Sequence, residues 1–182
     1  VGMSGGVDSS LTASLLVEQG YEVTGVYMKN WSQDLPGMKC PWAEDLADAK
    51  RVAVQLGIDF KVFDFEREYK QKVVDYMIDE YKLGRTPNPD IMCNQEVKFK
   101  LFLETAFEDG ADMIATGHYA RVEHRFSPTK FSNTASRPLS LDPPSGDNGA
   151  ADASENLSAN ARLLQAVDTN KDQTYFLYRV TA

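Results

Sequence analysis

Long apolar runs are missing from the sequence, and none approaches the roughly 20 residues that a membrane-spanning helix needs. The chain also does not open with a basic segment followed by an apolar one, which is the pattern of a secretory signal. These absences predict a cytoplasmic protein with no membrane partner. The chain starts at Val1 and stops directly after an apolar run, so we expect both ends to be truncated, and a targeting segment to have been lost if one existed.

Cysteine is scarce, since Cys40 and Cys93 are the two cysteines in 182 residues. Two cysteines so far apart exclude a disulfide scaffold and a four-cysteine zinc site, and the sequence contains no other ligand cluster typical of a structural metal. Reduced thiols are therefore expected. Cys40 has no histidine or second cysteine at ligand spacing, and we interpret it as an ordinary thiol.

An excess of positive charge is also absent. The net charge is −8 and the pI is about 4.8, which argues against a free-standing nucleic-acid-binding protein. Arg85, Lys98 and Lys100 still offer a modest basic patch. A hydrophobic fraction of 42% and a charged fraction of 25% are typical of a soluble globular protein, and 182 residues suffice for one domain with a sizeable core.

What the chain does contain, close to its start, is a loop rich in glycine and serine, MSGGVDSS (residues 3–10), followed by a helical apolar pattern over 11–18. Glycines let the backbone turn tightly, and a helix N-terminus presents unpaired N–H groups to an anion of pyrophosphate size. The loop is not a Walker A motif, because no lysine precedes Lys29. The alternative is a glycine turn with serine caps. Asp8 has two interpretations, a ligand of nucleotide-bound Mg²⁺ or an acid that complements the helix dipole.

Strand and helix patterns alternate after this loop, beginning with a strand over 21–28. The further segments are helices over 43–56, 66–83 and 95–107 and strands over 58–65 and 110–119. This order predicts an α/β fold with a parallel sheet, helices on both faces, and ligands at the carboxyl ends of the strands.

Three residues at predicted strand ends are candidates for nucleotide contact. Met28 is placed either to touch an adenine or to fill the core. Gly117 allows close approach of the backbone. His118 could contact a phosphate or ribose, although a histidine at a strand end is more often simply hydrogen-bonded.

The segment GRTPNPDIMCN (residues 84–94) contains two prolines separated by one residue, which predicts an extended, stiff loop. It offers an amide, a carboxylate and a thiol close together. Cys93 stands just before the helix predicted over 95–107, so we expect a lowered pKa for its thiol, helped by Lys98 and Arg85. The alternative is a buried cysteine in a structural turn.

Composition changes sharply near residue 125. Residues 125–160 are rich in Ser, Pro, Asn, Asp, Ala and Gly, and are predicted to be a disordered linker or insertion. Order should resume with a strand over 161–167, a turn over 168–173 and an apolar segment over 174–180. The expected organisation is a catalytic domain over 1–124, the insertion over 125–160, and a truncated continuation of the domain over 161–182.

Taken together, the motifs resemble those of the tRNA-specific 2-thiouridylase family. The resemblance rests on GMSGGVDSS (2–10), YMKNW (27–31), GRTPNPDIMCN (84–94), KF (98–99), ATGHYAR (115–121) and DTNKDQTYFL (168–177), in the family's order. It implies a PP-loop ATPase fold (adenine nucleotide alpha hydrolase-like, Rossmann-like) and ATP-dependent 2-thiolation of the wobble uridine of tRNA. The uracil O2 is adenylated, and sulfur from a cysteine persulfide then displaces AMP.

The resemblance also implies residue roles. Cys93 matches the nucleophile, and Asp90 suits proton transfer unless it is only a solvated turn carboxylate. The positions matching ATP contacts are Gly2, Met3, Ser4, Gly5, Gly6, Val7, Asp8, Ser9, Met28 and Gly117. Those matching contacts with the target base or the tRNA are Asn88, Pro89 and Asp90, and Lys171, Asp172 and Gln173. ATP with Mg²⁺, tRNA and a persulfide-carrying donor protein are the implied ligands and partners, and a monomer is expected.

One departure from the family is that its second cysteine, which carries the persulfide and forms a disulfide with the first, is not in this chain. The central domain and the C-terminal β-barrel of the family are not in it either, so the 182 residues alone should bind ATP without thiolating tRNA. Two other interpretations remain open at this point. One is a different PP-loop ligase or amidotransferase resembling GMP synthetase, and the other is a non-catalytic module that binds nucleotide or tRNA.

Overall fold

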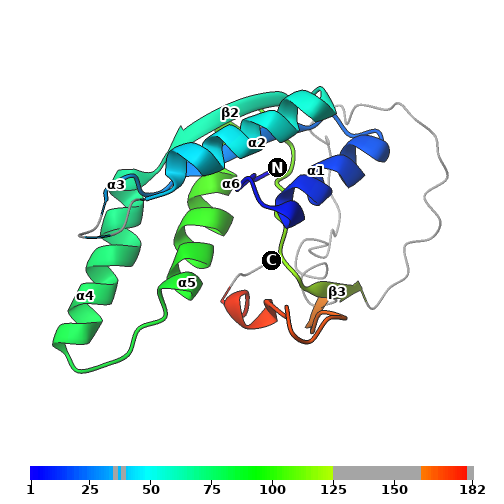
Figure 1. Ribbon diagram of the computed structural model, residues 1–182. Coiled ribbons are helices and arrows are strands. Elements are labelled where there is room, and N and C mark those ends of the chain that lie inside the picture. Colours follow the sequence, from blue (N-terminus) through cyan, green and yellow to red (C-terminus); the bar gives the residue numbers. More distant parts are fainter. Residues whose placement is uncertain (35–36, 38–39, 125–160, 180–182) are drawn as a thin grey trace, which may run out of the picture. The chain divides into compact units, whose positions relative to one another are not determined.

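The computed structural model describes residues 1–34, 37, 40–124 and 161–179 (Figure 1). The described residues form two compact units, one of residues 1–119 with 175–179 and one of residues 120–124 with 161–174. The predicted insertion over 125–160 and the end of the chain from Val180 lie outside the described residues. Within the described part, no helix is long and apolar enough to cross a membrane.

The first unit is built on a parallel sheet. Strand β1 (Thr24–Lys29) pairs in parallel with β2 (Asp59–Asp64), and the register places Thr24 opposite Asp59. On the other side of β1 lies the start of the chain, where Gly2 forms a parallel bridge with Val26. The N–H of Met3 donates to the carbonyl of Val26 at 2.8 Å. The start of the chain thus adds a single bridge beside β1, and the predicted parallel arrangement is confirmed.

The strand predicted over 110–119 is wrong. Gly110 turns the chain at φ +92°, and the following residues are assigned to no strand. Within the described residues, the backbone contact between this segment and the sheet is a hydrogen bond from the Gly2 N–H to the Ala115 carbonyl, at 2.9 Å. The segment runs beside the start of the chain without a ladder, and its side chains from Thr116 onward bond within the candidate site described below.

Helices follow the apolar patterns closely. Helix α1 spans Val7–Glu18 and α2 spans Trp42–Leu56, so α1 begins four residues before its apolar stripe. A second helical stretch consists of α3 (Glu66–Tyr69), the π-helix η1 (Lys70–Val74) and α4 (Asp75–Lys82). A third consists of α5 (Pro89–Met92), the π-helix η2 (Cys93–Leu101) and α6 (Phe102–Glu108). Figure 1 shows α4 and α5 joined by a long connection.

Helices cover both faces of the sheet, as predicted. Val26 and Tyr27 are neighbours on β1 and point to opposite faces, because side chains alternate along a strand. Val26 packs in one buried cluster with Phe65, the N-cap of α3, and with Val73, Val97, Phe102 and Ala106 from the second and third helical stretches. Tyr27 packs in another with Met3, Ala13 of α1 and Ala49 of α2. Helix α1, which follows the glycine loop, and the helix carrying Cys93 are therefore packed on opposite faces.

The second unit contains a small antiparallel sheet. Strand β3 (Arg121–His124) pairs with β4 (Ala161–Leu164), with Arg121 opposite Leu164. The strand predicted over 161–167 is thus four residues long, and β3 was not predicted. A short 3₁₀ helix, η3 (Thr174–Phe176), follows the turn after β4.

Candidate active site

The glycine loop is held in shape by its own hydroxyl groups. The hydroxyl of Ser9, a residue 6% exposed, accepts the Ser4 N–H at 3.2 Å and donates to the carbonyl of Gly6 at 3.3 Å. The Ser10 hydroxyl donates to the same carbonyl at 2.8 Å. Ser9 and Ser10 thus donate their hydroxyl hydrogens within the loop itself. The donors that the start of α1 can offer to an anion are then its backbone N–H groups.

Gly5 shows why glycine is needed here. It has φ +82°, and a Cβ on it would lie 2.7 Å from the Asp45 carbonyl oxygen of α2. The loop then enters α1, whose first helical backbone bond runs from the Ser10 N–H to the Gly6 carbonyl at 3.3 Å. The N–H groups of Val7, Asp8 and Ser9 precede that bond and have no partner within the helix. Three amides at the positive end of a helix dipole form a cradle that fits a phosphate chain.

Residues 116–119 close one side of this cradle. A Cβ on Gly117 would lie 2.7 Å from both the carbonyl carbon of Asp8 and the nitrogen of Ser9, so only glycine allows the two backbones to pack this closely. The Tyr119 hydroxyl donates to Asp8 Oδ1 at 2.9 Å. The bond occupies one lone pair of the Asp8 carboxylate, whose other lone pairs could ligate a metal ion. Tyr119 was not singled out from the sequence, although it stands in the ATGHYAR motif beside Gly117 and His118.

Met28 lies at the end of β1 and packs against the cluster around Phe102. Its Cε is 2.9 Å from the position that a Cβ on Gly2 would take, so Gly2 makes room for the methionine. The structure therefore contains Met28 in a core-packing role, one of the two roles expected of it. Adenine contact stays a prediction.

The loop predicted to be extended as far as Asn94 is instead helical from Pro89. Asn88 is the N-cap, with φ −113° and ψ 97°, and its Oδ1 accepts the N–H groups of Asp90 at 3.1 Å and Ile91 at 3.3 Å. Pro89 occupies the first helical position, where its missing N–H costs no hydrogen bond. The two prolines therefore start a helix rather than prevent one.

Replacing Asn88 by alanine should lower the free energy of unfolding by about 1 kcal/mol, because two first-turn N–H groups lose their acceptor. Denaturant titration of the complete protein followed by circular dichroism would measure the change. Asn88→Ser is the matched control and should stay close to the native value, since serine also caps helices well. Equal losses for both variants would contradict the capping role.

Cys93 begins η2 and is partly buried. Burial raises the pKa of its thiol above the ordinary value of 9.0, with Lys98 opposing and Asp90 adding to the rise. The lowered pKa predicted from the sequence is therefore wrong, because Cys93 lies one turn inside a packed helix instead of at its start. Burial also raises the pKa of Tyr69, and the charges of Cys93 and Asp90 add to the rise. Tyr69 therefore lies near both groups.

Two of the three residues of the expected basic patch, Arg85 and Lys100, form ion pairs with glutamates. Both Arg85 Nε and Nη2 bind Glu80 at 2.6 Å, and Lys100 lies 3.8 Å from Glu96. Arg85 thus does not assist Cys93. Lys98 remains the cation that favours the thiolate.

His118 is hydrogen-bonded on both ring nitrogens. Nε2 lies 3.2 Å from Oδ1 of Asn94, a residue 3% exposed, and Nδ1 lies 2.8 Å from the Thr116 hydroxyl. Its ring also packs at 5.4 Å on Phe99. Burial, and then the charge of Lys98, lower the pKa of His118 to about 4, so the ring is neutral near pH 7. The structure thus contains His118 as a hydrogen-bonded side chain, one of the two roles considered for it. Its contact with a phosphate or ribose stays a prediction.

The predicted tRNA-contacting residues lie in the second unit. Asp172 accepts the Ala166 N–H at 2.9 Å and the Thr174 hydroxyl at 2.6 Å, and these bonds lower the pKa of its carboxyl. The Lys171 N–H donates to the Asp168 carbonyl at 3.2 Å. Asp172 therefore holds the turn that presents Lys171 and Gln173, which leaves their contact with tRNA a prediction.

Both cysteines are free thiols. The Cys40 N–H donates to Asp34 Oδ1 at 2.9 Å, in a loop separate from Cys93. Within the described part of the chain, no three or more His, Cys, Asp and Glu side chains gather in a way that could hold a metal ion.

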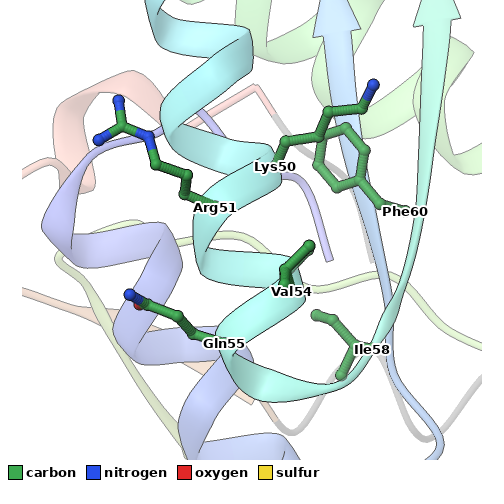
Figure 2. A pocket seen from close by; sticks show the side chains of 7 residues that line it. Lys50, Arg51, Val54, Gln55, Ile58 and Phe60 are labelled. Carbon is green, nitrogen blue, oxygen red and sulfur yellow. The ribbon is translucent and has the colours of Figure 1, made fainter.

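An open pocket of about 490 Å³ lies beside α2 and the start of β2 (Figure 2). Figure 2 shows Val54, Ile58 and Phe60 on one side of α2, with the Lys50 side chain beside Phe60, while the Arg51 side chain extends from the other side of the helix. None of the residues predicted to bind ATP, tRNA or the target base lines this pocket.

The sequence of the chain matches one family along its full length, the tRNA methyl transferase HUP domain, over residues 1–182. The chain belongs to this family. It is 46% identical over 181 residues to the tRNA-specific 2-thiouridylase MnmA of Bacillus subtilis (strain 168), a match that covers 100% of this chain and 40% of the relative. The corresponding proteins of Listeria monocytogenes serotype 4a (strain HCC23) and Exiguobacterium sibiricum (strain DSM 17290 / CCUG 55495 / CIP 109462 / JCM 13490 / 255-15) are each 47% identical with the same coverage.

The resemblance to the 2-thiouridylases noted from the motifs is thereby confirmed. The chain spans about 40% of the length of the curated relatives it matches. Among solved structures, an NMN synthetase from Francisella tularensis is similar with a TM-score of 0.37 and 19% identity, covering 59% of this chain and 38% of that one.

Proposed function

We propose that the protein containing this chain is an ATP-dependent tRNA-uridine 2-sulfurtransferase that thiolates the wobble uridine. The observation that carries the proposal is the placement of the glycine loop and the Cys93 helix in one compact unit, joined through residues 116–119. The 46% identity to a tRNA-specific 2-thiouridylase supports the same reaction. The reaction takes place in the cytoplasm.

The first chemical step needs ATP at the glycine loop. The three first-turn amides of α1 hold the phosphates, and the Asp8 carboxylate would ligate the Mg²⁺ that neutralises them. Met28 and Gly117 border the adenosine. Uracil O2 attacks the α-phosphorus, and the bond to the bridging oxygen breaks, so pyrophosphate leaves and an O2-adenylated base remains.

The second step uses Cys93. In the complete protein, a second cysteine outside this chain carries a persulfide received from a donor protein. The Cys93 thiolate attacks the inner sulfur of that persulfide, a disulfide forms, and the terminal sulfur is released to attack C2 of the base. AMP leaves with the former O2. Asp90, one turn before Cys93 and exposed, exchanges the proton of the thiol or the base.

The base is presented by the start of the Cys93 helix. Asn88 fixes the first turn through its two backbone contacts, and Pro89 and Asp90 then face the flipped uracil. Lys171, Asp172 and Gln173 contact the tRNA backbone from the turn that Asp172 organises. The acidic net charge of −8 means that this chain does not bind RNA by bulk electrostatics, and the working unit is a monomer that depends on its further domains for grip.

The decisive experiment is pyrophosphate release from ATP by the complete protein. It is measured with no tRNA, with unmodified tRNA carrying a wobble uridine, and with the same tRNA carrying cytidine at that position. We expect release to be stimulated by the uridine tRNA alone, together with sulfur incorporation. Release that ignores tRNA would identify another adenylating ligase or amidotransferase of this fold, and ATP binding without any release would identify a non-catalytic module.

A further inference from the structure

The first turn of α1 carries one acidic side chain, that of Asp8, beside the amides proposed to hold the phosphates. An aspartate at such a place can bind first-turn N–H groups itself, because its short side chain reaches the neighbouring backbone. Its negative charge is also attracted to the positive end of the helix dipole. The Asp8 carboxylate and the phosphates of a nucleotide are therefore competitors for the same donors.

Another helix of the same unit has first-turn amides that a side chain does occupy. At the start of α5, Oδ1 of Asn88 accepts the N–H groups of Asp90 and Ile91. Helix α1 begins differently, since its N-cap is Gly6, which has no side chain to offer. Within the described parts of the chain, the Asp8 carboxylate accepts one hydrogen bond, and its donor is a hydroxyl and not an amide.

The donor to Asp8 is the Tyr119 hydroxyl, which lies 2.9 Å from Oδ1. Gly117 brings this tyrosine into reach, because it packs directly on the backbone of Asp8 and Ser9. In Figure 1 the segment that contains both residues passes the start of α1. A hydrogen bond to a charged acceptor is stronger than one between neutral groups. The bond therefore fixes the direction of a carboxylate that would otherwise be able to turn toward the amides.

We propose that Tyr119 is a positioning residue for nucleotide binding. Its hydroxyl holds the Asp8 carboxylate away from the first-turn amides of α1, and these N–H groups stay available to the phosphates. The carboxylate keeps further lone pairs for the metal ion that accompanies ATP. This role rests on the ATP binding of the proposed function and adds to it a residue that acts through Asp8 and not on the nucleotide itself.

The test measures how tightly the complete protein binds a non-hydrolysable ATP analogue, by isothermal titration calorimetry in excess EDTA. Without a metal ion, the Asp8 carboxylate can only repel or displace the phosphates, so the effect of its position is isolated. Tyr119→Phe removes the hydroxyl and keeps the ring. We expect it to weaken binding by about 10-fold, the loss typical of one hydrogen bond to a charged acceptor. Tyr81→Phe is the matched control and should bind like the native protein, because Tyr81 is 58% exposed on α4.

A double-mutant cycle shows whether Tyr119 acts through the carboxylate. Asp8→Ala removes the competing group, so in EDTA this variant should bind the analogue at least as tightly as the native protein. Adding Tyr119→Phe to Asp8→Ala should then change nothing. The cycle is repeated with Mg²⁺, where Asp8→Ala also loses a metal ligand, and the added Tyr119→Phe should again be without effect.

Native affinity in Tyr119→Phe would overturn the positioning role. An equal loss with and without the Asp8 side chain would overturn it too, since a merely structural role of Tyr119 predicts that result. The proposed function is judged separately, because a native protein that shows the expected cycle but incorporates no sulfur into tRNA would leave the role of Tyr119 standing and remove the thiolation. A native protein that binds the analogue neither in EDTA nor with Mg²⁺ would overturn both.

Discussion

Serine in place of Cys93 should abolish sulfur incorporation into tRNA, by on the order of 10⁴-fold or more, while tRNA-stimulated pyrophosphate release continues. Serine keeps the shape of the cysteine side chain with a smaller oxygen atom, but its hydroxyl cannot attack a persulfide as a thiolate does. In the proposed mechanism, adenylation takes place at the glycine loop and does not use Cys93. Parallel assays of pyrophosphate and of incorporated sulfur in the complete protein would separate the two steps. A variant that still thiolates tRNA would remove Cys93 from the mechanism.

The pH dependence of Cys93 follows from its burial. The pKa of its thiol is raised above 9.0, so the thiol is mostly protonated at neutral pH and its alkylation rate should still be increasing past pH 9. Lys98→Met should slow alkylation at any pH below that range, because removing the cation raises the pKa further. Lys100→Met is the matched control, since Lys100 is paired with Glu96. A rate that levels off below pH 8 would contradict the buried thiol.

Alanine at position 117 should weaken ATP binding strongly. Its Cβ would meet the backbone of Asp8 and Ser9 at 2.7 Å, and neither backbone atom can rotate aside. Overpacking of this kind costs about 1–3 kcal/mol, and if the cost falls on the nucleotide-bound form, affinity drops by about 5- to 150-fold. Isothermal titration calorimetry with a non-hydrolysable ATP analogue would measure it.

Gly25→Ala provides the control for a simple loss of stability. A Cβ at Gly25 would lie 2.6 Å from the Met3 sulfur, which is a side-chain atom that can move, and it does not touch the start of α1. Both variants should lower the melting temperature, and only Gly117→Ala should lower ATP affinity by more than the loss of folded protein explains. Similar affinities in the two variants would mean that residues 116–119 do not shape the phosphate cradle.

Local signals were sufficient for much of the fold. Apolar spacing and stop residues located α1, α2 and the helical stretch from Glu66 to within four residues, because these patterns record which side of each element is buried. The start of the stretch that carries Cys93 was missed by six residues. Glycines in MSGGVDSS marked the loop correctly, since the left-handed φ of Gly5 is a local property of the backbone. The order of strands and helices then restricted the sheet to a parallel one with helices on both faces.

The wrong predictions for Pro89, Cys93 and residues 110–119 share a cause, which is that each depends on contacts outside its own stretch of sequence. Pro89 was read as a helix breaker, but its effect depends on where the helix begins, and that was set by the Asn88 cap. The Cys93 pKa was judged from charges nearby in sequence, whereas burial by packed neighbours controls it, and Arg85 had already paired with Glu80. Residues 110–119 have the composition of a strand, yet strand formation requires a partner along the whole segment.

The sequence by itself determined the glycine loop, the alternation of helices and strands, and the family, because each is encoded in short stretches whose geometry depends on their own residues. Only the tertiary structure decided that Tyr119 binds Asp8, 111 residues away, that His118 joins Asn94 to this loop, and that the Cys93 thiol is buried. Contacts over such separations leave no periodic trace in the chain. They arise when distant segments pack together and exclude water, and that packing sets both the hydrogen bonds and the pKa values of the site.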